Sequence, residues 1–357
     1  METLPSLAQT RSPPLANMKS WTPIILSTIG LLLVSTPAQC RHRRRPAETG
    51  PAEEPAALKD QSCSLHNANE PLIDVYHFGA NGITHKEVRK VSNKASSPIA
   101  STCGQYTPHR RSNRIAGGYD ARAGEFPSYV QVVPVIREGP GKPELTSLCG
   151  GVIIGDQYVL TAAHCMKDIE NKQNEYVTLN VIPVQEQVDP DKQTKLPISD
   201  FCAEKRYETT TSGYDFGIIR LKDPIRLSKN TTIACLADRD VTARDQLFTV
   251  GTGWVSYMAT GDRLKVLPVK TINCAGDKHQ TKICTKSSFT GTSCLGDSGG
   301  GIYYNEDGLQ YVAGLVSHGT GSCYDEVDQT MYGTDVFNSL ADIQALVNAC
   351  TRSVVWP

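Results

Sequence analysis

Short apolar or alternating runs of residues follow one another along the chain from residue 115 onward. Clusters of Gly, Pro, Asp and Asn separate these runs, a pattern typical of antiparallel sandwiches and barrels. The runs lie at residues 129–136, 151–160, 176–184, 216–221, 247–250 and 311–316. We therefore predict an all-β domain that occupies residues 115–350.

Only the end of this region has helical spacing. Residues 336–350 follow Asp335, a candidate helix cap, and residues 351–357 are left as a C-terminal tail. Four apolar side chains recur at helical intervals on one face: Leu340, Ile343, Leu346 and Val347. We predict a single C-terminal helix that completes the β domain.

The first 114 residues show a different pattern. One apolar run at residues 21–34 follows Lys19 and precedes small residues at 36–38, which is the order of a secretory signal peptide. We expect the signal peptide to occupy residues 1–39, with Met18 as a candidate initiator, and the protein to be secreted and extracellular. A signal anchor that stays in the membrane is the alternative.

Residues 46–113 are rich in Pro, Ala, Ser, Asn and Lys and show no sustained hydrophobic period. We interpret residues 40–114 as a propeptide or linker, with a little local structure around residues 72–78. The two cysteines of residues 46–113, Cys63 and Cys103, are too few for a self-sufficient disulfide module.

Composition narrows the class of protein. The net charge of −1 gives no basic excess, so nucleic acid is not an expected partner. The chain has 12 cysteines but no CxxC pair, which argues against a zinc ribbon and favours disulfides formed in an oxidising compartment. There is no zinc-type ligand spacing and no tight carboxylate cluster for calcium, so we expect neither a metal nor a cofactor.

Three segments of the β-rich region carry residues suited to nucleophilic catalysis. They read LTAAHC at 160–165, YDFGIIRL at 214–221 and TSCLGDSGGG at 292–301. A serine hydroxyl is a weak nucleophile until a base takes its proton, and the base in turn needs an orienting group. His164, Asp215 and Ser298 supply the base, the carboxylate and the nucleophile in the chain order of the chymotrypsin class.

Together with RIAGG at 114–118 and VSHG at 316–319, these segments resemble a trypsin/chymotrypsin-family serine protease over about residues 115–350. The resemblance implies two antiparallel six-stranded β-barrels with the active site in the cleft between them. By the same resemblance, His164 and Asp215 lie on the first barrel and Ser298 on the second. The N–H groups of Gly296 and Ser298 would form the oxyanion hole.

The resemblance also implies activation by proteolysis. Cleavage between Arg114 and Ile115 would free the Ile115 amine, which would fold inward and pair with Asp297. A buried charge needs such a partner because an unpaired one is costly. The uncut chain would then be a zymogen.

The primary specificity pocket follows from the family pattern. It places Thr292 at the floor and Ser317, Gly319 and Thr330 at the walls. Since no aspartate stands at the floor, we predict an uncharged, narrowed pocket that takes small to medium side chains such as Ala, Val or Leu. If the register is shifted by two residues, Asp328 reaches the pocket, and cleavage after Arg or Lys is the alternative.

Two residues depart from the family pattern. Gly301 stands where proline usually follows GDSGG, and His318 stands where tryptophan is usual. The second change leaves the preference for neighbouring substrate side chains open, while the catalytic residues are unaffected.

The resemblance also suggests how the cysteines pair. It implies the bonds Cys149–Cys165, Cys294–Cys323, Cys274–Cys284 and Cys103–Cys235, the last of which would keep a cut propeptide attached. We further predict a Cys202–Cys350 bond between the strand before Asp215 and the C-terminal helix. Cys40 and Cys63 could pair with each other, or Cys63 could be free or bonded to another chain.

Asn230 begins an N-glycosylation sequon that a secreted route would expose. The expected partners are protein or peptide substrates, an activating trypsin-like protease and protein protease inhibitors. The rival hypothesis from another class is a protease-like scaffold protein in which the activation cut never occurs.

Overall fold

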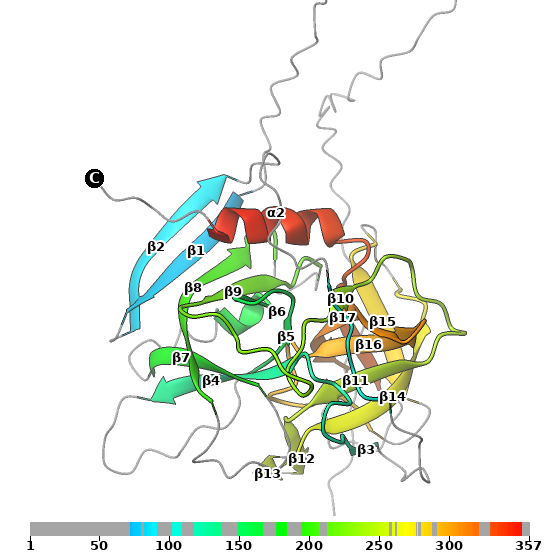
Figure 1. The fold of residues 1–357 in the computed structure, drawn as a ribbon. Helices are drawn as coiled ribbons and strands as arrows, with labels where there is room; N and C mark the ends of the chain where they lie inside the picture. Colours follow the sequence, from blue (N-terminus) through cyan, green and yellow to red (C-terminus); the bar gives the residue numbers. More distant parts are fainter. Residues whose placement is uncertain are drawn as a thin grey trace, which may run out of the picture. The chain divides into compact units, whose positions relative to one another are not determined.

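The computed structural model describes residues 72–79, 82–90, 102–108, 118–136, 149–166, 176–183, 194–207, 213–256, 259–260, 263–275, 277, 280–287, 291–320 and 329–351. The signal segment, Cys40, Cys63, Arg114, Ile115, Cys323 and Asp328 lie outside these residues. The secondary structure of the described part is mostly β-strand, and Figure 1 gives the labels used below.

Six antiparallel strands close the first barrel. Along the sheet they follow the order β8-β7-β4-β5-β6-β9, and pairing of β9 with β8 completes the ring. The strands are β4 (Tyr129–Ile136), β5 (Cys149–Ile153), β6 (Tyr158–Thr161), β7 (Tyr176–Pro183), β8 (Leu196–Glu204) and β9 (Gly217–Leu221).

The second barrel has the same construction. Its strands follow the order β17-β16-β11-β14-β15-β18, and β18 pairs with β17 to close it. They are β11 (Leu247–Gly251), β14 (Lys265–Ile272), β15 (Lys282–Ser287), β16 (Gly301–Glu306), β17 (Leu309–Gly319) and β18 (Thr330–Asp335). Short strands add to this sheet or pair apart from it: β3 (Tyr119–Asp120) on β14, β10 (Cys235–Leu236) on β17, and β12 (Trp254–Ser256) with β13 (Ala259–Thr260).

The C-terminal helix α2 (Leu340–Thr351) packs against β8 and β9 of the first barrel. Its predicted apolar face is the buried one, since Ile343, Leu346 and Val347 have no exposed surface. The helix begins directly after Ser339, while Asp335 caps the preceding turn by accepting the N–H of Asn338 at 2.9 Å. The predicted fold of two six-stranded barrels and a C-terminal helix is therefore confirmed.

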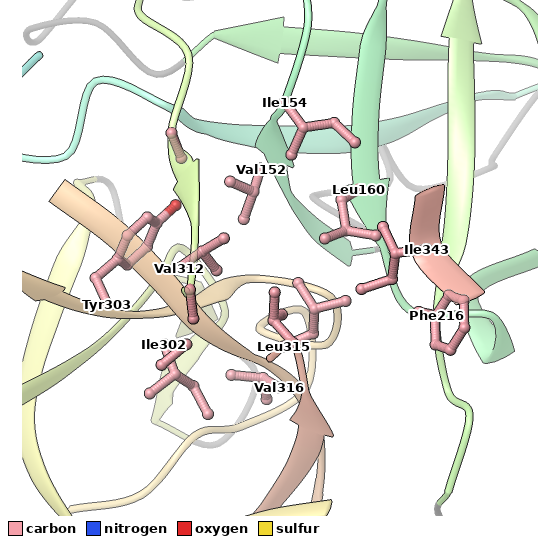
Figure 2. Close-up of a cluster of buried hydrophobic side chains, with 14 of the residues drawn as sticks. Val152, Ile154, Leu160, Phe216, Ile302, Tyr303, Val312, Leu315, Val316 and Ile343 are labelled. Atoms are coloured by element: carbon pink, nitrogen blue, oxygen red, sulfur yellow. The ribbon is translucent and has the colours of Figure 1, made fainter. Parts of the chain in front are cut away.

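One continuous core joins the two barrels. Figure 2 shows its centre, where Val152, Ile154 and Leu160 of the first barrel face side chains of the second barrel and of α2. The remaining labelled members are Phe216, Ile302, Tyr303, Val312, Leu315, Val316 and Ile343. Burying each such side chain stabilises the fold by about 1.5–3 kcal/mol, so the junction between the barrels is held firmly.

A β-hairpin lies in the region interpreted as a propeptide or linker. Its strands β1 (Leu72–Gly79) and β2 (Gly82–Lys90) extend the sheet of the first barrel, because β1 pairs with β8 from Asp200 to Glu204. Along the same side of β8, strand β7 pairs only with Leu196 and Pro197. The hairpin therefore satisfies backbone groups of β8 that β7 leaves unpaired.

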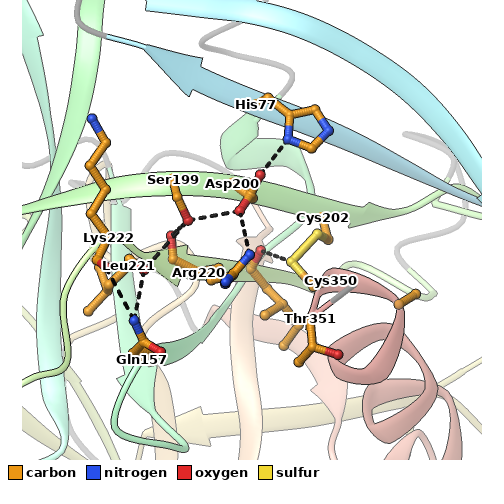
Figure 3. Close-up of polar contacts among 12 residues, drawn as sticks. His77, Gln157, Ser199, Asp200, Cys202, Arg220, Leu221, Lys222, Cys350 and Thr351 are labelled. Atoms are coloured by element: carbon orange, nitrogen blue, oxygen red, sulfur yellow. Dashed lines mark hydrogen bonds and ion pairs between the residues drawn. A yellow bond between two sulfur atoms is a disulfide. The ribbon is translucent and has the colours of Figure 1, made fainter. Parts of the chain in front are cut away.

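Side chains also fasten this hairpin to the barrel. His77 Nδ1 lies 2.5 Å from Asp200 Oδ1, as Figure 3 shows, and Arg89 donates to the carbonyl oxygen of Ala349 in α2 at 2.8 Å. Ile73 and Val75 are fully buried in the shared core. The local structure around residues 72–78 is thus a strand of the barrel sheet. The boundary at residue 114 remains a prediction.

Candidate active site

His164 follows strand β6 at the junction of the two barrels. The strand ends at Thr161, and the buried residues Ala162 and Ala163 lead into a helical turn that carries the histidine. The next residue, Cys165, is bonded to Cys149 on β5, which fixes the turn to the barrel wall. This disulfide therefore fixes the backbone that carries the His164 imidazole.

Asp215 is fully buried directly before strand β9 and binds His164 twice. Its Oδ2 lies 2.8 Å from His164 Nδ1, and its Oδ1 accepts the His164 backbone N–H at 3.0 Å. Oδ2 also accepts the hydroxyl of Ser317 at 2.5 Å. Burial alone would raise the pKa of Asp215, but the hydrogen bonds from His164 and Ser317 and the charge of His164 outweigh it and lower the pKa.

An ionised Asp215 fixes the tautomer of His164. A carboxylate can only accept hydrogen bonds, so His164 Nδ1 carries the proton that is shared with it. The other ring nitrogen, Nε2, is then left with a lone pair in the neutral form. This is the state that a general base needs.

Ser298 lies on a tight turn that presses against the segment before His164. Its carbonyl oxygen accepts the Gly150 N–H at 2.7 Å, and Gly299 adopts a positive φ of 77°. A Cβ on Gly299 would stand 2.2 Å from Thr161 Oγ1, so only glycine fits this close approach. The Ser298 hydroxyl donates to the carbonyl oxygen of Ser317 at 3.5 Å.

Ser317 therefore connects the predicted nucleophile to the predicted carboxylate. Its carbonyl oxygen contacts Ser298 and its side chain contacts Asp215. From the sequence, Ser317 was expected only at the pocket wall. The difference comes from a β-bulge in strand β17, where Val316 pairs with Gly333 and His318 with the adjacent Tyr332. Such a bulge re-aims side chains, and the motif VSHG contains no signal for it.

The turn before Ser298 holds Gly296 and Asp297. Gly296 has a positive φ of 93°, which favours glycine, and its role in an oxyanion hole remains a prediction. The Asp297 carboxylate accepts the N–H groups of Gly253 at 2.7 Å and Cys294 at 2.8 Å. Burial raises the pKa of Asp297 to about 6, and the two N–H donors oppose this only in part.

No Lys, Arg or His of the described residues lies within ion-pair distance of Asp297. The space for its carboxylate comes from two glycines. A Cβ on Gly251 would stand 1.9 Å from Asp297 Oδ1, and one on Gly253 would stand 2.6 Å from it. Among the described residues, a buried carboxylate without an ion-pair partner thus lies next to the predicted nucleophile.

Three of the four predicted pocket residues lie together. A Cβ on Gly319 would stand 3.8 Å from Thr292 Oγ1 and 3.7 Å from the carbonyl oxygen of Thr330. Gly319 therefore lies within van der Waals distance of both Thr292 and Thr330. The Thr292 hydroxyl is buried and makes no hydrogen bond within the described structure. The side chain of the fourth residue, Ser317, is directed to Asp215 instead.

The comparison with protein families agrees with this geometry. A sequence model of one family, Trypsin, matches residues 115–340, which is more than half of the chain. The chain belongs to the trypsin family. Its two barrels are those of a trypsin/chymotrypsin-type serine protease domain.

A curated relative of this trypsin-family chain is a mouse (Mus musculus) protein named Transmembrane protease serine 11C. The two are 24% identical over 290 residues, which cover 74% of this chain and 64% of the relative. The match therefore spans less than two thirds of the relative's length. In the described part of this chain, no helix combines the length and apolar composition needed to cross a membrane.

Four disulfides link the trypsin-family domain within the described residues: Cys103–Cys235, Cys149–Cys165, Cys202–Cys350 and Cys274–Cys284. Cys202 lies on β8 and Cys350 in α2, so their bond ties the helix to the first barrel, as Figure 3 shows. Cys294 is also disulfide-bonded, while Cys323 lies outside the described residues.

One cluster near the site resembles a metal site but does not fit one. Ligand atoms of Cys149, His164 and Cys165 lie within 4.8 Å of one another. The two sulfurs are bonded to each other, and His164 Nδ1 is directed to Asp215, so neither thiolates nor a free Nδ1 lone pair are offered. Asn230, the first residue of the predicted sequon, lies half-buried in a turn, and its glycosylation remains a prediction.

The two departures from the trypsin-family pattern have different surroundings. A Cβ on Gly301 would stand 2.5 Å from the ring of Tyr303, so this ring occupies the space that a larger residue would need. His318 is exposed and stacks on Tyr332, with ring centroids 4.8 Å apart and planes inclined by 12°. Only His318 is therefore in a position to meet a substrate.

Proposed function

We propose that this protein is a secreted serine endopeptidase that is made as a zymogen and activated by cleavage between Arg114 and Ile115. One observation carries the proposal. Buried Asp215 binds His164 Nδ1, and Ser317 links the same carboxylate to Ser298. A base, its orienting carboxylate and a hydroxyl nucleophile are the groups that acyl transfer requires.

In the proposed reaction, Ser298 Oγ attacks the carbonyl carbon of the scissile peptide bond. His164 Nε2 accepts the serine proton and then donates it to the leaving amine, while Asp215 stabilises the imidazolium. The N–H groups of Gly296 and Ser298 would stabilise the oxyanion by about 3 kcal/mol each. Water then attacks the acyl carbon while His164 takes its proton, and His164 returns a proton to Ser298 Oγ as the ester bond breaks and the acid product leaves.

The surroundings of Asp297 support the proposed activation. Its raised pKa of about 6 and its lack of a described cation mean that an incoming ammonium group would stabilise the charged carboxylate. The Ile115 amine, freed by cleavage, is the proposed cation. The resulting ion pair would shape the turn that carries Gly296 and Ser298.

The proposed specificity is for small to medium uncharged side chains. Thr292 and Gly319 lie close together and carry no charge, which supports an uncharged pocket at this place. Such a pocket would not favour Arg114, so a separate trypsin-like protease is the proposed activator. Cleavage after Arg or Lys through Asp328 remains the alternative specificity.

The proposed location is extracellular, with a signal-anchored form as the alternative. Disulfides such as Cys103–Cys235 are compatible with an oxidising compartment. That bond would keep the segment before Arg114 attached after the cut. Protein substrates and protein protease inhibitors are the proposed partners.

A serine-directed phosphonate tests the proposal directly. We expect protein cut at Arg114 to be labelled at Ser298 and to hydrolyse peptides, and the uncut protein to do neither. Ser298→Ala should abolish both labelling and hydrolysis while the circular dichroism spectrum and melting temperature stay unchanged. A folded, correctly cut protein that is not labelled would instead support the scaffold hypothesis.

A further inference from the structure

The backbone just before Asp215 has an unusual conformation. Tyr214 has a φ of 60°, in the left-handed region that a bulky side chain rarely adopts. The Phe216 N–H donates to the Tyr214 carbonyl oxygen at 2.9 Å, so the chain turns tightly around Asp215. A conformation of this kind persists only where its surroundings hold it. The direction of the Asp215 side chain therefore depends on what holds Tyr214.

The guanidinium group of Arg206 covers the ring of Tyr214. The Arg206 Cζ atom lies 4.1 Å from the ring centroid, which is close enough for a cation–π attraction. Because Tyr214 is half-buried, water weakens this attraction less than it would at an open surface. Arg206 thus contacts the side chain of the residue that precedes the proposed orienting carboxylate.

Two carboxylates on different elements fix Arg206 in turn. Its Nε and Nη2 donate to the two carboxylate oxygens of Glu204, at 2.9 Å each, and Nη2 also lies 2.9 Å from Asp342 Oδ1 on α2. Glu204 is buried at the end of β8, and a two-point fork holds a guanidinium group in a defined plane. Burial alone would lower the pKa of Arg206, but the hydrogen bonds and charges of Glu204 and Asp342 outweigh it and raise the pKa. Arg206 is therefore a cation whose position is set by β8 and α2.

The turn that carries Arg206 also borders the proposed base. The Tyr207 N–H donates to the Glu204 carbonyl oxygen at 3.4 Å, which closes a turn directly after β8. The ring of Tyr207 lies beside the imidazole of His164, with centroids 6.3 Å apart. Successive residues of one turn thus contact the chain neighbour of Asp215 and its hydrogen-bond partner.

We propose that Arg206 is a positioning residue, which holds Tyr214 in its left-handed conformation and thereby aims the Asp215 carboxylate at His164. This inference rests on the proposed peptidase activity. The simpler explanation is that Arg206 only ties β8 to α2 through its two carboxylate partners. The two explanations differ in whether the effect of losing Arg206 depends on the residue at position 214.

Kinetics in two backgrounds separate these explanations. Arg206→Met is made alone and together with Tyr214→Asn, because Asn adopts a positive φ more readily than Tyr and needs no ring contact to do so. The measured quantity is kcat/KM of protein cut at Arg114. Alone, Arg206→Met should lower it about fivefold, mainly through kcat, which is the size of effect of one cation–π contact. In the Tyr214→Asn background it should lower it less than about twofold, since no ring remains to be held.

Arg239→Met is the matched control. Arg239 lies over the ring of Tyr304 at 4.8 Å and pairs with Asp245 and Glu306, but it makes no described contact with the triad. Its kcat/KM should equal that of the wild type. The Arg206 side chain is 36% exposed, so Arg206→Met should fold, and the melting temperature of each variant checks this. Equal losses from Arg206→Met in both backgrounds, or no loss in either, would overturn the proposal.

A second measurement does not depend on hydrolysis. The proton on His164 Nδ1 is shared with Asp215, so its magnetic resonance signal, assigned by comparison with Asp215→Asn, reports the alignment of the two groups. Arg206→Met should shift or broaden this signal, and it should do so less in the Tyr214→Asn background. An equal change in both backgrounds, or no change, would overturn the proposal even in an active enzyme. If the cut protein hydrolyses no peptide, the proposed function fails, while this signal still decides whether Arg206 aligns Asp215 with His164.

Discussion

Ser317 is the residue at which the two halves of the site meet. Its carbonyl oxygen contacts Ser298, its hydroxyl donates to Asp215, and the same hydroxyl oxygen lies 3.2 Å from His318 Nδ1. Substituting single residues that make these contacts should therefore have measurable effects. The first prediction concerns Asp215, the carboxylate that orients the proposed base.

Replacing Ser317 by alanine should weaken catalysis. The change removes one of the hydrogen bonds that lower the pKa of Asp215, and a hydrogen bond to a charged group contributes about 1.5–3 kcal/mol. We expect kcat/KM to fall at least about tenfold while KM changes little. Steady-state kinetics with a small peptide substrate would measure both.

Ser128→Ala is the matched control for this variant. Ser128 is also buried, but it donates to Tyr303 at 3.4 Å and makes no described contact with the triad. Its kinetics should equal those of the wild type. If Ser317→Ala retains wild-type kcat/KM, the bond to Asp215 contributes nothing to catalysis.

Asp297 should make the stability of the uncut protein depend on pH. Its pKa is raised from 3.8 to about 6 in the folded protein, so the folded state binds a proton that the unfolded chain has released. Below its unfolded pKa, the Asp297 carboxyl is protonated in both states and does not lower the free energy of unfolding. Its penalty grows as the pH rises from about 4 to about 6, and above that pH it stays at about 3 kcal/mol for a shift of two units.

Cleavage at Arg114 should remove this penalty, because the Ile115 amine would pair with the charged Asp297. The free energy of unfolding of the cut protein minus that of the uncut protein should therefore be about 2–3 kcal/mol larger at pH 7 than at pH 4. Urea unfolding at the two pH values gives this difference. A difference that is equal at both values would argue against the pairing.

The residues of the predicted triad could be chosen from the sequence, but the contacts that join them could not. His164, Asp215 and Ser298 stand in short segments whose order is specific, so they could be chosen without coordinates. The link through Ser317 could not, because it depends on a bulge in the pairing of β17 with β18. A bulge is a property of two paired strands, and the local sequence of one strand does not encode it.

At the scale of elements, the hydrophobic pattern predicted only part of the two barrels. It marked β4, β7, β9, β11 and β17 and placed β5 and β6 in one run, but it did not mark β8, β14, β15, β16, β18 or the hairpin of β1 and β2. Strand β2 reads GITHKEVRK and is largely polar, so it lacks the alternation that marks a half-buried strand. Its place is decided by tertiary contacts, above all the pairing of β1 with β8. Because β2 is largely polar, the local composition suggested a linker.

Two valines of the hairpin test how firmly it belongs to the domain. Val75 on β1 has no exposed surface, whereas Val88 on β2 is 52% exposed. Val75→Ala should lower the free energy of unfolding by about 2 kcal/mol, and Val88→Ala by less than about 0.5 kcal/mol. Urea unfolding of the uncut protein measures both. Equal effects would mean that the hairpin is an independent appendage.

At the scale of the whole molecule, the shared core makes the site a property of both barrels. His164 and Asp215 come from the first barrel and Ser298 from the second, and they meet because Val152 and Leu160 pack against Leu315 and its neighbours. Within the second barrel, the predicted pocket residues Thr292 and Gly319 lie close together. In the proposed function, specificity and self-activation would both depend on this pocket.

This coupling gives a prediction about self-activation. With an uncharged Thr292, cut wild-type enzyme should cleave the Arg114–Ile115 bond of uncut molecules only slowly. In Thr292→Asp, the new carboxylate would pair with the Arg114 side chain. A hydrogen bond to a charged group contributes about 1.5–3 kcal/mol, so the rate should rise at least about tenfold. Activation would then no longer require a separate protease.

Uncut Ser298→Ala protein is the right substrate for this experiment, because it presents the Arg114–Ile115 bond but cannot cleave it. Its conversion is followed on reducing gels with equal amounts of three cut enzymes: wild type, Thr292→Asp and Thr292→Asn. The Asn variant has nearly the size of Asp without its charge and should remain as slow as the wild type. Rapid conversion by the wild type would mean that an acidic residue such as Asp328 reaches the pocket, and that the enzyme activates itself through basic specificity.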